Sequence, residues 1–185
     1  IKNNVLFVAP PLSSETYLET FPALSPDGMQ LFFCSASNRL MPGSYREMKY
    51  SLVRVAFNPV ERSVGKTDTL YNANDEGRSA KFPRISPDGK YLLYTLSDYG
   101  NFSIWHKDAD LRMIDLQTLQ TDSLSAVNSD DVESYHSWST NSRWFVFSSR
   151  RMDGLYTRPY ICYVDKNGKT GKPFLLPQKH ADYYT

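Results

Sequence analysis

Apolar and polar residues alternate in short runs along most of the chain, and clusters of Gly, Pro, Asn, Asp and Ser separate the runs. This period of two is typical of β-strands with one buried face, whereas the 3.6-residue period of helices is nearly absent. The most helix-like segment, 110–121, alternates equally well and has strand-like neighbours. We therefore expect an all-β protein.

Three segments repeat the same order of residue types. "FPALSPDGMQLFFCS" (21–35), "FPRISPDGKYLLYTL" (82–96) and "YHSWSTNSRWFVFSS" (135–149) each contain an aromatic residue, a large apolar residue, a turn and an apolar run. Further strand patterns follow at 50–57, 110–116 and 160–165, and each is followed by another short apolar segment. The repeating unit is therefore predicted to have four antiparallel strands.

The turn inside each repeat predicts a hairpin rather than a catalytic site. Pro fixes φ at the second turn position, Asp tolerates the third, and Gly supplies positive φ at the fourth. In the third copy Asn141 is expected to take positive φ. The predicted structural turn residues are Ser25, Pro26, Asp27, Gly28, Ser86, Pro87, Asp88, Gly89 and Asn141.

Four-stranded units at this spacing are typical of β-propeller blades. We expect blades at about 19–73, 80–127 and 133–177, with 1–12 as a possible outer strand of a preceding blade. Because propellers typically need 4 to 8 blades to close, we expect a segment of a six- to eight-bladed ring, or two arcs that pair by self-association.

The pattern F-P-x-[LI]-S-P-D-G-x-x-[LI]-[FL]-[FY] resembles the TolB-like, WD-repeat-like propeller family over roughly residues 19–177. This resemblance implies a non-enzymatic module for protein or peptide recognition or scaffolding, in a periplasmic or cell-envelope location. The same motif occurs in propellers attached to peptidases and in a sugar-lyase branch. The alternatives are therefore the propeller portion of an enzyme, either a peptidase or a carbohydrate-active lyase, and a glycan-sensing propeller.

Composition excludes several functional classes. Lys and Arg total 21 against 20 Asp and Glu, so no basic field exists to bind nucleic acid. No apolar run approaches the length of a transmembrane segment. Cys34 and Cys162 lie far apart in the sequence, and we expect two buried thiols rather than a disulfide or zinc site.

The sequence contains no nucleophile elbow, phosphate-binding loop, zinc-protease motif or dinucleotide fingerprint. We therefore predict no catalytic residue, metal or cofactor within this chain. His136 stands where the other repeats have Pro22 and Pro83, and we expect it to be a polar residue of the central channel. The carboxylates near 108–110 and 130–133 do not form a calcium loop.

The loops that follow the second strand of each repeat are rich in residue types common at recognition surfaces. We expect them to lie together at one end of the propeller, where their side chains either form a binding rim or are individually solvated. Arg84, just before the second turn, either points into the channel or pairs with a carboxylate of a neighbouring blade. The candidate binding residues are Arg39, Tyr45, Arg84, Tyr99, Trp105, His136, Arg150, Arg151 and Tyr156.

Overall fold

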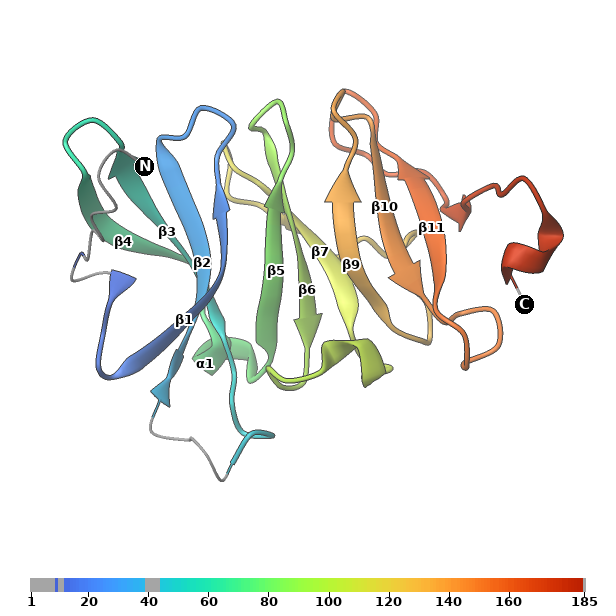
Figure 1. Ribbon diagram of the computed structural model, residues 1–185, viewed down its shortest axis with the longest axis horizontal. Helices are drawn as coiled ribbons and strands as arrows, with labels where there is room; N and C mark the ends of the chain where they lie inside the picture. Colours follow the sequence, from blue (N-terminus) through green and yellow to red (C-terminus); the bar gives the residue numbers. More distant parts are fainter. Residues whose placement is uncertain (1–8, 10–11, 39–43, 185) are drawn as a thin grey trace.

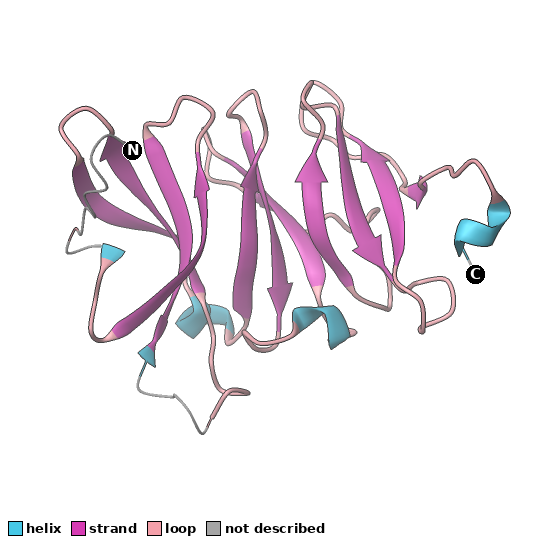
Figure 2. Ribbon diagram, in the orientation of Figure 1, coloured by secondary structure: helices cyan, strands magenta, loops and turns pink. Residues whose placement is uncertain are grey.

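A computed structural model describes residues 9, 12–38 and 44–184. It contains three antiparallel sheets of four strands each, which stand side by side in an arc (Figure 1). The predicted all-β fold is confirmed, and the few helical segments are single turns outside the strands (Figure 2). No helix in the described ranges is long and apolar enough to cross a membrane.

The three sheets are named blades 1 to 3 in chain order. Blade 1 contains β1 (Tyr17–Leu24), β2 (Gln30–Ser37), β3 (Ser51–Asn58) and β4 (Ser63–Tyr71). After the short helix α1 (Ala73–Glu76), blade 2 contains β5 (Ser79–Ile85), β6 (Tyr91–Ser97), β7 (Asp110–Asp115) and β8 (Thr121–Asp122). Blade 3 contains β9 (Glu133–Trp138), β10 (Trp144–Ser149), β11 (Arg158–Tyr163) and β12 (Phe174–Leu175).

Strand order follows the chain in every blade, so β1, β5 and β9 are the first strands of successive sheets. The outer strands β8 and β12 have only two residues each and are shorter than their apolar segments suggest. The strand proposed for residues 1–12 falls mostly outside the described residues.

The three repeated turns have the same hairpin geometry. Gly28 and Gly89 take positive φ, 72° and 74°, as predicted. In the third turn the left-handed residue is Ser142 at φ 57°, so the assignment of positive φ to Asn141 was wrong. Asn141 instead takes the part of the turn Asp, because its Oδ1 accepts a hydrogen bond from the Arg143 amide at 3.0 Å.

Each first strand carries a bulge at its leading aromatic residue. Phe21, Phe82 and Tyr135 all have positive φ, 54°, 53° and 49°. The pairing register shifts at this point in all three blades. Positive φ is unfavourable for bulky residues, so the surrounding sheet must hold this conformation.

Two apolar cores join the blades. One lies between blades 1 and 2 and includes Phe32, Cys34, Leu92 and Tyr94. The other lies between blades 2 and 3 and contains aromatic and aliphatic side chains, among them Leu93, Phe145 and Phe147. Both cysteines are buried free thiols, as predicted. Each blade is therefore stabilised mainly by its neighbours, as expected for stacked repeats.

Candidate binding rim and inner-strand face

The loops β2–β3, β6–β7 and β10–β11 lie at the end of the arc opposite the three repeated hairpins (Figure 1). Their described parts, 44–50, 98–109 and 150–157, are called the loop rim here. Large apolar side chains are 44% to 75% exposed along this rim. They are Tyr45, Phe102, Trp105, Met152, Leu155 and Tyr156. Because burial of such side chains is favourable, their clustering at one end marks a candidate interaction surface.

The first two rim loops are tied together. The Gly100 amide donates to the Met48 carbonyl at 2.7 Å, and Asn101 Nδ2 donates to the Tyr45 carbonyl at 3.2 Å. The Tyr45 and Tyr99 rings meet edge to face with centroids 6.1 Å apart. A Cβ on Gly100 would lie 2.3 Å from the Tyr50 ring, so this close approach requires glycine. Blades 1 and 2 therefore present one continuous part of the rim.

The rim carboxylates serve to shape the loops. Asp153 Oδ1 accepts hydrogen bonds from the Leu155 and Tyr156 amides at 2.9 and 3.0 Å, and its Oδ2 lies 2.7 Å from Arg158 Nη1. These two amides, with Arg158, lower the pKa of Asp153 to about 2. The β10–β11 loop thus holds Leu155 and Tyr156 in their exposed positions.

Arg151 is a predicted binding residue that the structure places in a buried network. Its Nη2 lies 2.8 Å from Glu133 Oε1 and 2.6 Å from the Val127 carbonyl. The Glu133 side chain is fully buried and also accepts hydrogen bonds from Ser129 and Ser149. A role for Arg151 as a ligand-binding guanidinium is therefore not supported, because its donors already neutralise a buried carboxylate.

The other rim candidates have different outcomes. Arg150 pairs with Asp131 at 3.4 Å, and its Cζ lies 5.4 Å from the centroid of the Trp105 ring, which remains largely exposed. Arg150 therefore supports the Trp105 ring, while Trp105 and Tyr156 stay available for contacts. Arg39 lies outside the described residues.

The strands β1, β5 and β9 together line one broad face of the arc, called the inner-strand face here (Figure 1). The three bulge aromatics form a ladder across it. Ring centroids of Phe21 and Phe82 lie 4.5 Å apart, and those of Phe82 and Tyr135 lie 5.0 Å apart. Lys81 Nζ lies 5.7 and 5.8 Å from the Phe21 and Phe82 centroids. The ladder thus combines an apolar surface with a cation.

His136 does not line an open channel as expected, because the residue is only 3% exposed. Neither ring nitrogen makes a hydrogen bond of normal geometry, although backbone groups of Leu93 and Phe82 lie near enough to affect its titration. Burial lowers the pKa of His136 to about 4, so the ring is neutral at pH 7. Among the described residues, no three or more His, Cys, Asp or Glu side chains are placed to hold a metal.

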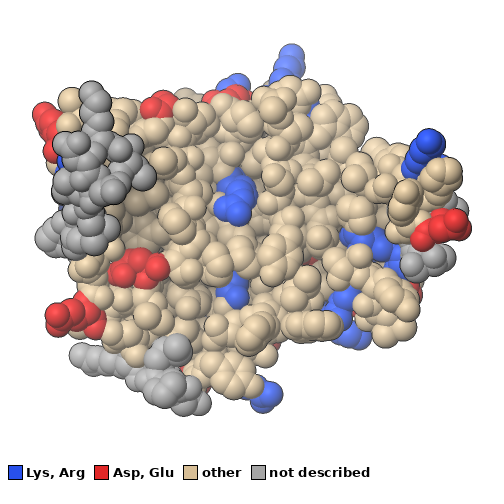
Figure 3. Space-filling view, viewed as in Figure 1, with Lys and Arg blue, Asp and Glu red and all other residues tan. Residues whose placement is uncertain are grey.

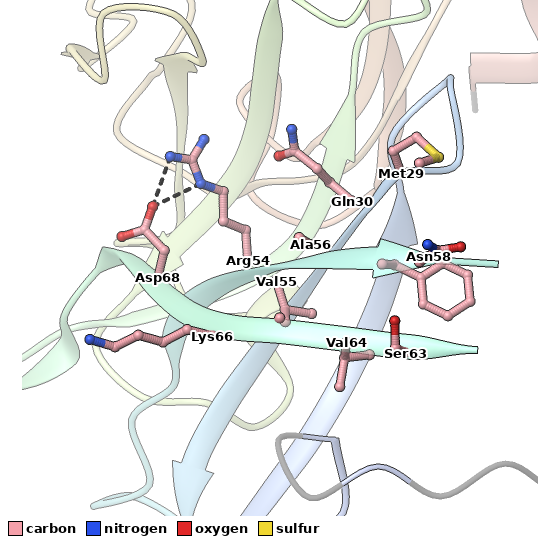
Figure 4. Close-up of a pocket in the computed structure, with 12 residues that line it drawn as sticks. Met29, Gln30, Arg54, Val55, Ala56, Asn58, Ser63, Val64, Lys66 and Asp68 are labelled. Carbon is pink, nitrogen blue, oxygen red and sulfur yellow. Dashed lines mark hydrogen bonds and ion pairs between the residues drawn. The ribbon is translucent and has the colours of Figure 1, made fainter. Parts of the chain in front are cut away.

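An open cavity of about 720 Å³ lies beside β3, β4 and the β1–β2 turn (Figure 4). Two of its charged side chains, Arg54 and Asp68, pair with each other at 2.7 Å. Lys66 extends away from this pair in Figure 4. Among the residues that line the cavity, no nucleophile is paired with a base.

Several features of the two surfaces were missed by sequence reasoning. Phe102, Met152 and Leu155 belong to the loops singled out from the sequence, and their apolar character was the available signal. Lys81 had no signal, because a single lysine in an alternating strand is expected to lie on the solvent-exposed face. The equivalent aromatics were aligned, but their positive φ depends on the bulge and could not be inferred from sequence.

No family model matches the chain, and no curated protein matches it significantly. Solved structures of similar fold include one from a study of two prolyl endopeptidases, with TM-score 0.55 and 15% identity over 84% of this chain and 22% of that one. The propeller domain of the Trilobed protease from Pyrococcus furiosus has TM-score 0.51 and 15% identity over 89% and 44%. An oligogalacturonate lyase from Vibrio parahaemolyticus has TM-score 0.51 and 15% identity over 85% and 38%.

This chain thus spans less than half the length of each of these three proteins of similar fold. At 15% identity the likeness establishes the architecture alone. A propeller fold is supported, whereas membership of the TolB-like family remains a prediction from the sequence motif. The three blades form a β-propeller arc of the kind found in peptidases and lyases.

Proposed function

We propose that this chain is the propeller portion of an enzyme that acts on peptides, and that the loop rim binds polypeptide. The observation that carries the proposal is the row of six exposed apolar side chains on the loops of three successive blades. Trp and Tyr, which supply three of them, are common among residues that dominate binding energy.

Four carboxylates at or beside the rim have arginine partners, whereas Arg46, Glu47 and Lys107 are exposed rim charges with no ion pair among the described residues. Asp131 and Asp153 pair with Arg150 and Arg158, while Arg78 lies within 4 Å of both Asp98 and Asp108. A ligand that covers the exposed rings therefore does not have to strip water from an unpaired carboxylate at these positions. Trp105 is additionally held in place by the guanidinium beside it, which lowers the entropy lost on binding.

The enzymatic part of the proposal is supported by the solved structures of similar fold. Propellers of similar architecture occur in proteins named as a protease, as prolyl endopeptidases and as a lyase. The chain itself shows no nucleophile motif, so the bond-breaking groups would belong to another part of the protein. The alternative is a non-enzymatic recognition module, and the predicted envelope location belongs to that alternative.

The rim is tested by measuring binding of fluorescent, unstructured peptides by anisotropy. Trp105→Ser and Tyr156→Ser should each weaken binding by tenfold or more, as expected for exposed aromatic anchors at a binding surface. Val60→Ser is the matched control, because Val60 is 89% exposed in the β3–β4 turn at the opposite end of the arc. Equal effects of rim and control variants would refute the binding site.

The enzymatic part needs the complete protein, tested with the same peptides for hydrolysis by mass spectrometry. Cleavage that slows in Trp105→Ser, with most of the change in KM, would support a rim that delivers substrate. Peptide binding at the rim without turnover by the complete protein would contradict the enzymatic part and leave the recognition module as the function.

A further inference from the structure

Two cationic side chains of β5 have no carboxylate partner among the described residues. Lys81 is only 3% exposed and forms no ion pair there, and its Nζ contacts only the Phe21 and Phe82 rings within cation–π range. Arg84 is exposed, and the one hydrogen bond of its guanidinium runs from Nη1 to the Pro83 carbonyl at 3.1 Å. A buried cation without an anion is costly, so its presence calls for an explanation.

The bulge at Phe82 brings these two cations to the same face of the sheet. Lys81 pairs with Thr95 and Arg84 with Leu93, and the register shifts between the two pairs. Thr95 and Leu93 are two residues apart on β6 and therefore point the same way. The inserted residue thus aligns side chains that a regular strand would place on opposite faces.

No carboxylate of the described residues forms an ion pair with either cation. Of the acidic residues on the three first strands, Glu133 pairs with Arg151, and Glu19 lines a cavity of blade 1 with Phe33 and Val53. The space-filling view shows basic side chains in the middle of the inner-strand face, over β5, and an acidic side chain to their left, over β1 (Figure 3). This face therefore attracts an anion.

The aromatic ladder supplies an apolar surface beside the two cations. Tyr135 is 54% exposed and lies against Phe82, which directly follows Lys81 in the sequence. All three ladder residues keep an unfavourable positive φ, and such strain concentrates at functional positions. A ligand that suits this face has a carboxylate next to an apolar or aromatic group.

We propose that the inner-strand face binds a peptide carboxylate with Lys81 and Arg84, while an adjacent apolar side chain of the peptide packs on Phe82 and Tyr135. The site is separate from the loop rim and rests on the proposed function only in taking a peptide as its ligand. The carboxylate belongs either to the C-terminus of the peptide or to an Asp or Glu side chain, which share the same chemistry.

The protonation of neighbouring groups is compatible with this site. Burial lowers the pKa of Lys81 to about 8, so its ammonium is charged at pH 7. Burial raises the pKa of Cys34 to about 12, and the thiol does not neutralise the lysine. Burial also lowers the pKa of His106, which interacts electrostatically with Lys81 and is uncharged at neutral pH. Binding should therefore weaken as the pH rises through about 8, while Arg84 keeps its charge.

The test titrates the chain with three probes and follows binding by NMR. The probes are acetyl-Ala-Phe with a free carboxylate, the same dipeptide as its amide, and acetyl-Glu-Phe-amide. We expect the amide of acetyl-Ala-Phe to bind at least tenfold more weakly than the free acid. Comparison of the free acid with acetyl-Glu-Phe-amide then shows whether the site takes a terminal or a side-chain carboxylate.

Three variants complete the test. Lys81→Met and Arg84→Gln should each weaken binding of the free acid about tenfold or more, since charge-assisted bonds are lost, and leave binding of the amide unchanged. Lys90→Gln, an exposed cation of the same blade, should have no effect. The loss of affinity above pH 8 should disappear in Lys81→Met.

Equal binding of acid and amide would overturn the proposal, as would full affinity in Lys81→Met. Galacturonate binding as strong as that of the best peptide probe would assign the site to a sugar acid and refute the peptide part. Trp105→Ser leaves this site intact, so failure of the rim and failure of the inner-strand site are distinguishable.

Discussion

Replacing Lys81 with Met should stabilise the protein at neutral pH. The fold lowers the pKa of this lysine from 10.5 to about 8 because burial disfavours its charge. At about 1.4 kcal/mol per unit, this shift corresponds to a penalty of about 3 kcal/mol. The variant loses a cation–π contact worth about 0.5–2 kcal/mol. The net gain in unfolding free energy is therefore about 1–3 kcal/mol at pH 7.

The pH dependence identifies the cause. Below about pH 8 the lysine is charged in both folded and unfolded states, and the penalty is fully present. As the pH rises from there toward 10.5, the folded state loses the proton first, so wild type gains stability by up to about 1.4 kcal/mol per pH unit relative to the variant. Subtracting the two curves cancels the cysteines and tyrosines, which titrate in both proteins.

The assay is urea unfolding of wild type, Lys81→Met and the exposed control Lys90→Met at pH 7, 8 and 9. We expect an advantage of Lys81→Met that shrinks with rising pH and a control within about 0.5 kcal/mol of wild type. A variant less stable than wild type by the same amount at every pH would refute the reasoning, because it would show that Lys81 stabilises the fold by packing alone.

Four further predictions concern the turns, the rim and the arc. Gly89→Val should lower the unfolding free energy by about 1–2 kcal/mol through backbone strain alone, since a Cβ there meets no atom within 4 Å; an unchanged melting temperature would contradict this. Gly100→Ala should cost about 1–3 kcal/mol by overpacking and shift NMR signals of both joined rim loops. Arg151→Met should cost about 3–5 kcal/mol by leaving Glu133 unpaired, and Glu133→Gln in that background should recover part of the loss. Light scattering should show concentration-dependent association of this chain.

The hairpins and the blade architecture were predictable from sequence because their causes are local. Gly28 and Gly89 take positive φ through a turn chemistry that involves four consecutive residues. Once the turn and the strand period are known, the four-stranded unit follows from spacing. The error at Asn141 came from weighing its tolerance of positive φ alone, whereas its side chain was needed to accept the Arg143 amide.

The sites were less predictable because their properties depend on residues distant in sequence. Arg151 has the composition of a recognition residue, but Glu133 is placed beside it only when β9 and β10 pair. Lys81 is unusual for its burial and for the register shift that aligns it with Arg84. The residues next to it in the sequence predict neither property. Residue type alone therefore selected the rim loops and, on the inner-strand face, Arg84 and His136, but it did not select Lys81.

The outward faces of the first and last blades differ in a way that bears on both proposed sites. On the outward face of blade 1, Leu12 packs with the cluster of Phe33, Val53 and Val55. On blade 3, Tyr163 and Phe174 remain 42% and 48% exposed, and neither belongs to an apolar core of the described residues. Continuation of the propeller would therefore begin by covering blade 3.

Each added blade brings one more first strand and one more rim loop, because both recur once per repeat. Added blades would lengthen the rim and enclose the inner-strand face, excluding water from the surroundings of Lys81 and Arg84. Attraction between these cations and a carboxylate strengthens as the local dielectric falls. The same enclosure raises the free-energy cost of leaving the cations unpaired. A closed ring would therefore increase the affinity for the carboxylate and also the cost of leaving the site empty.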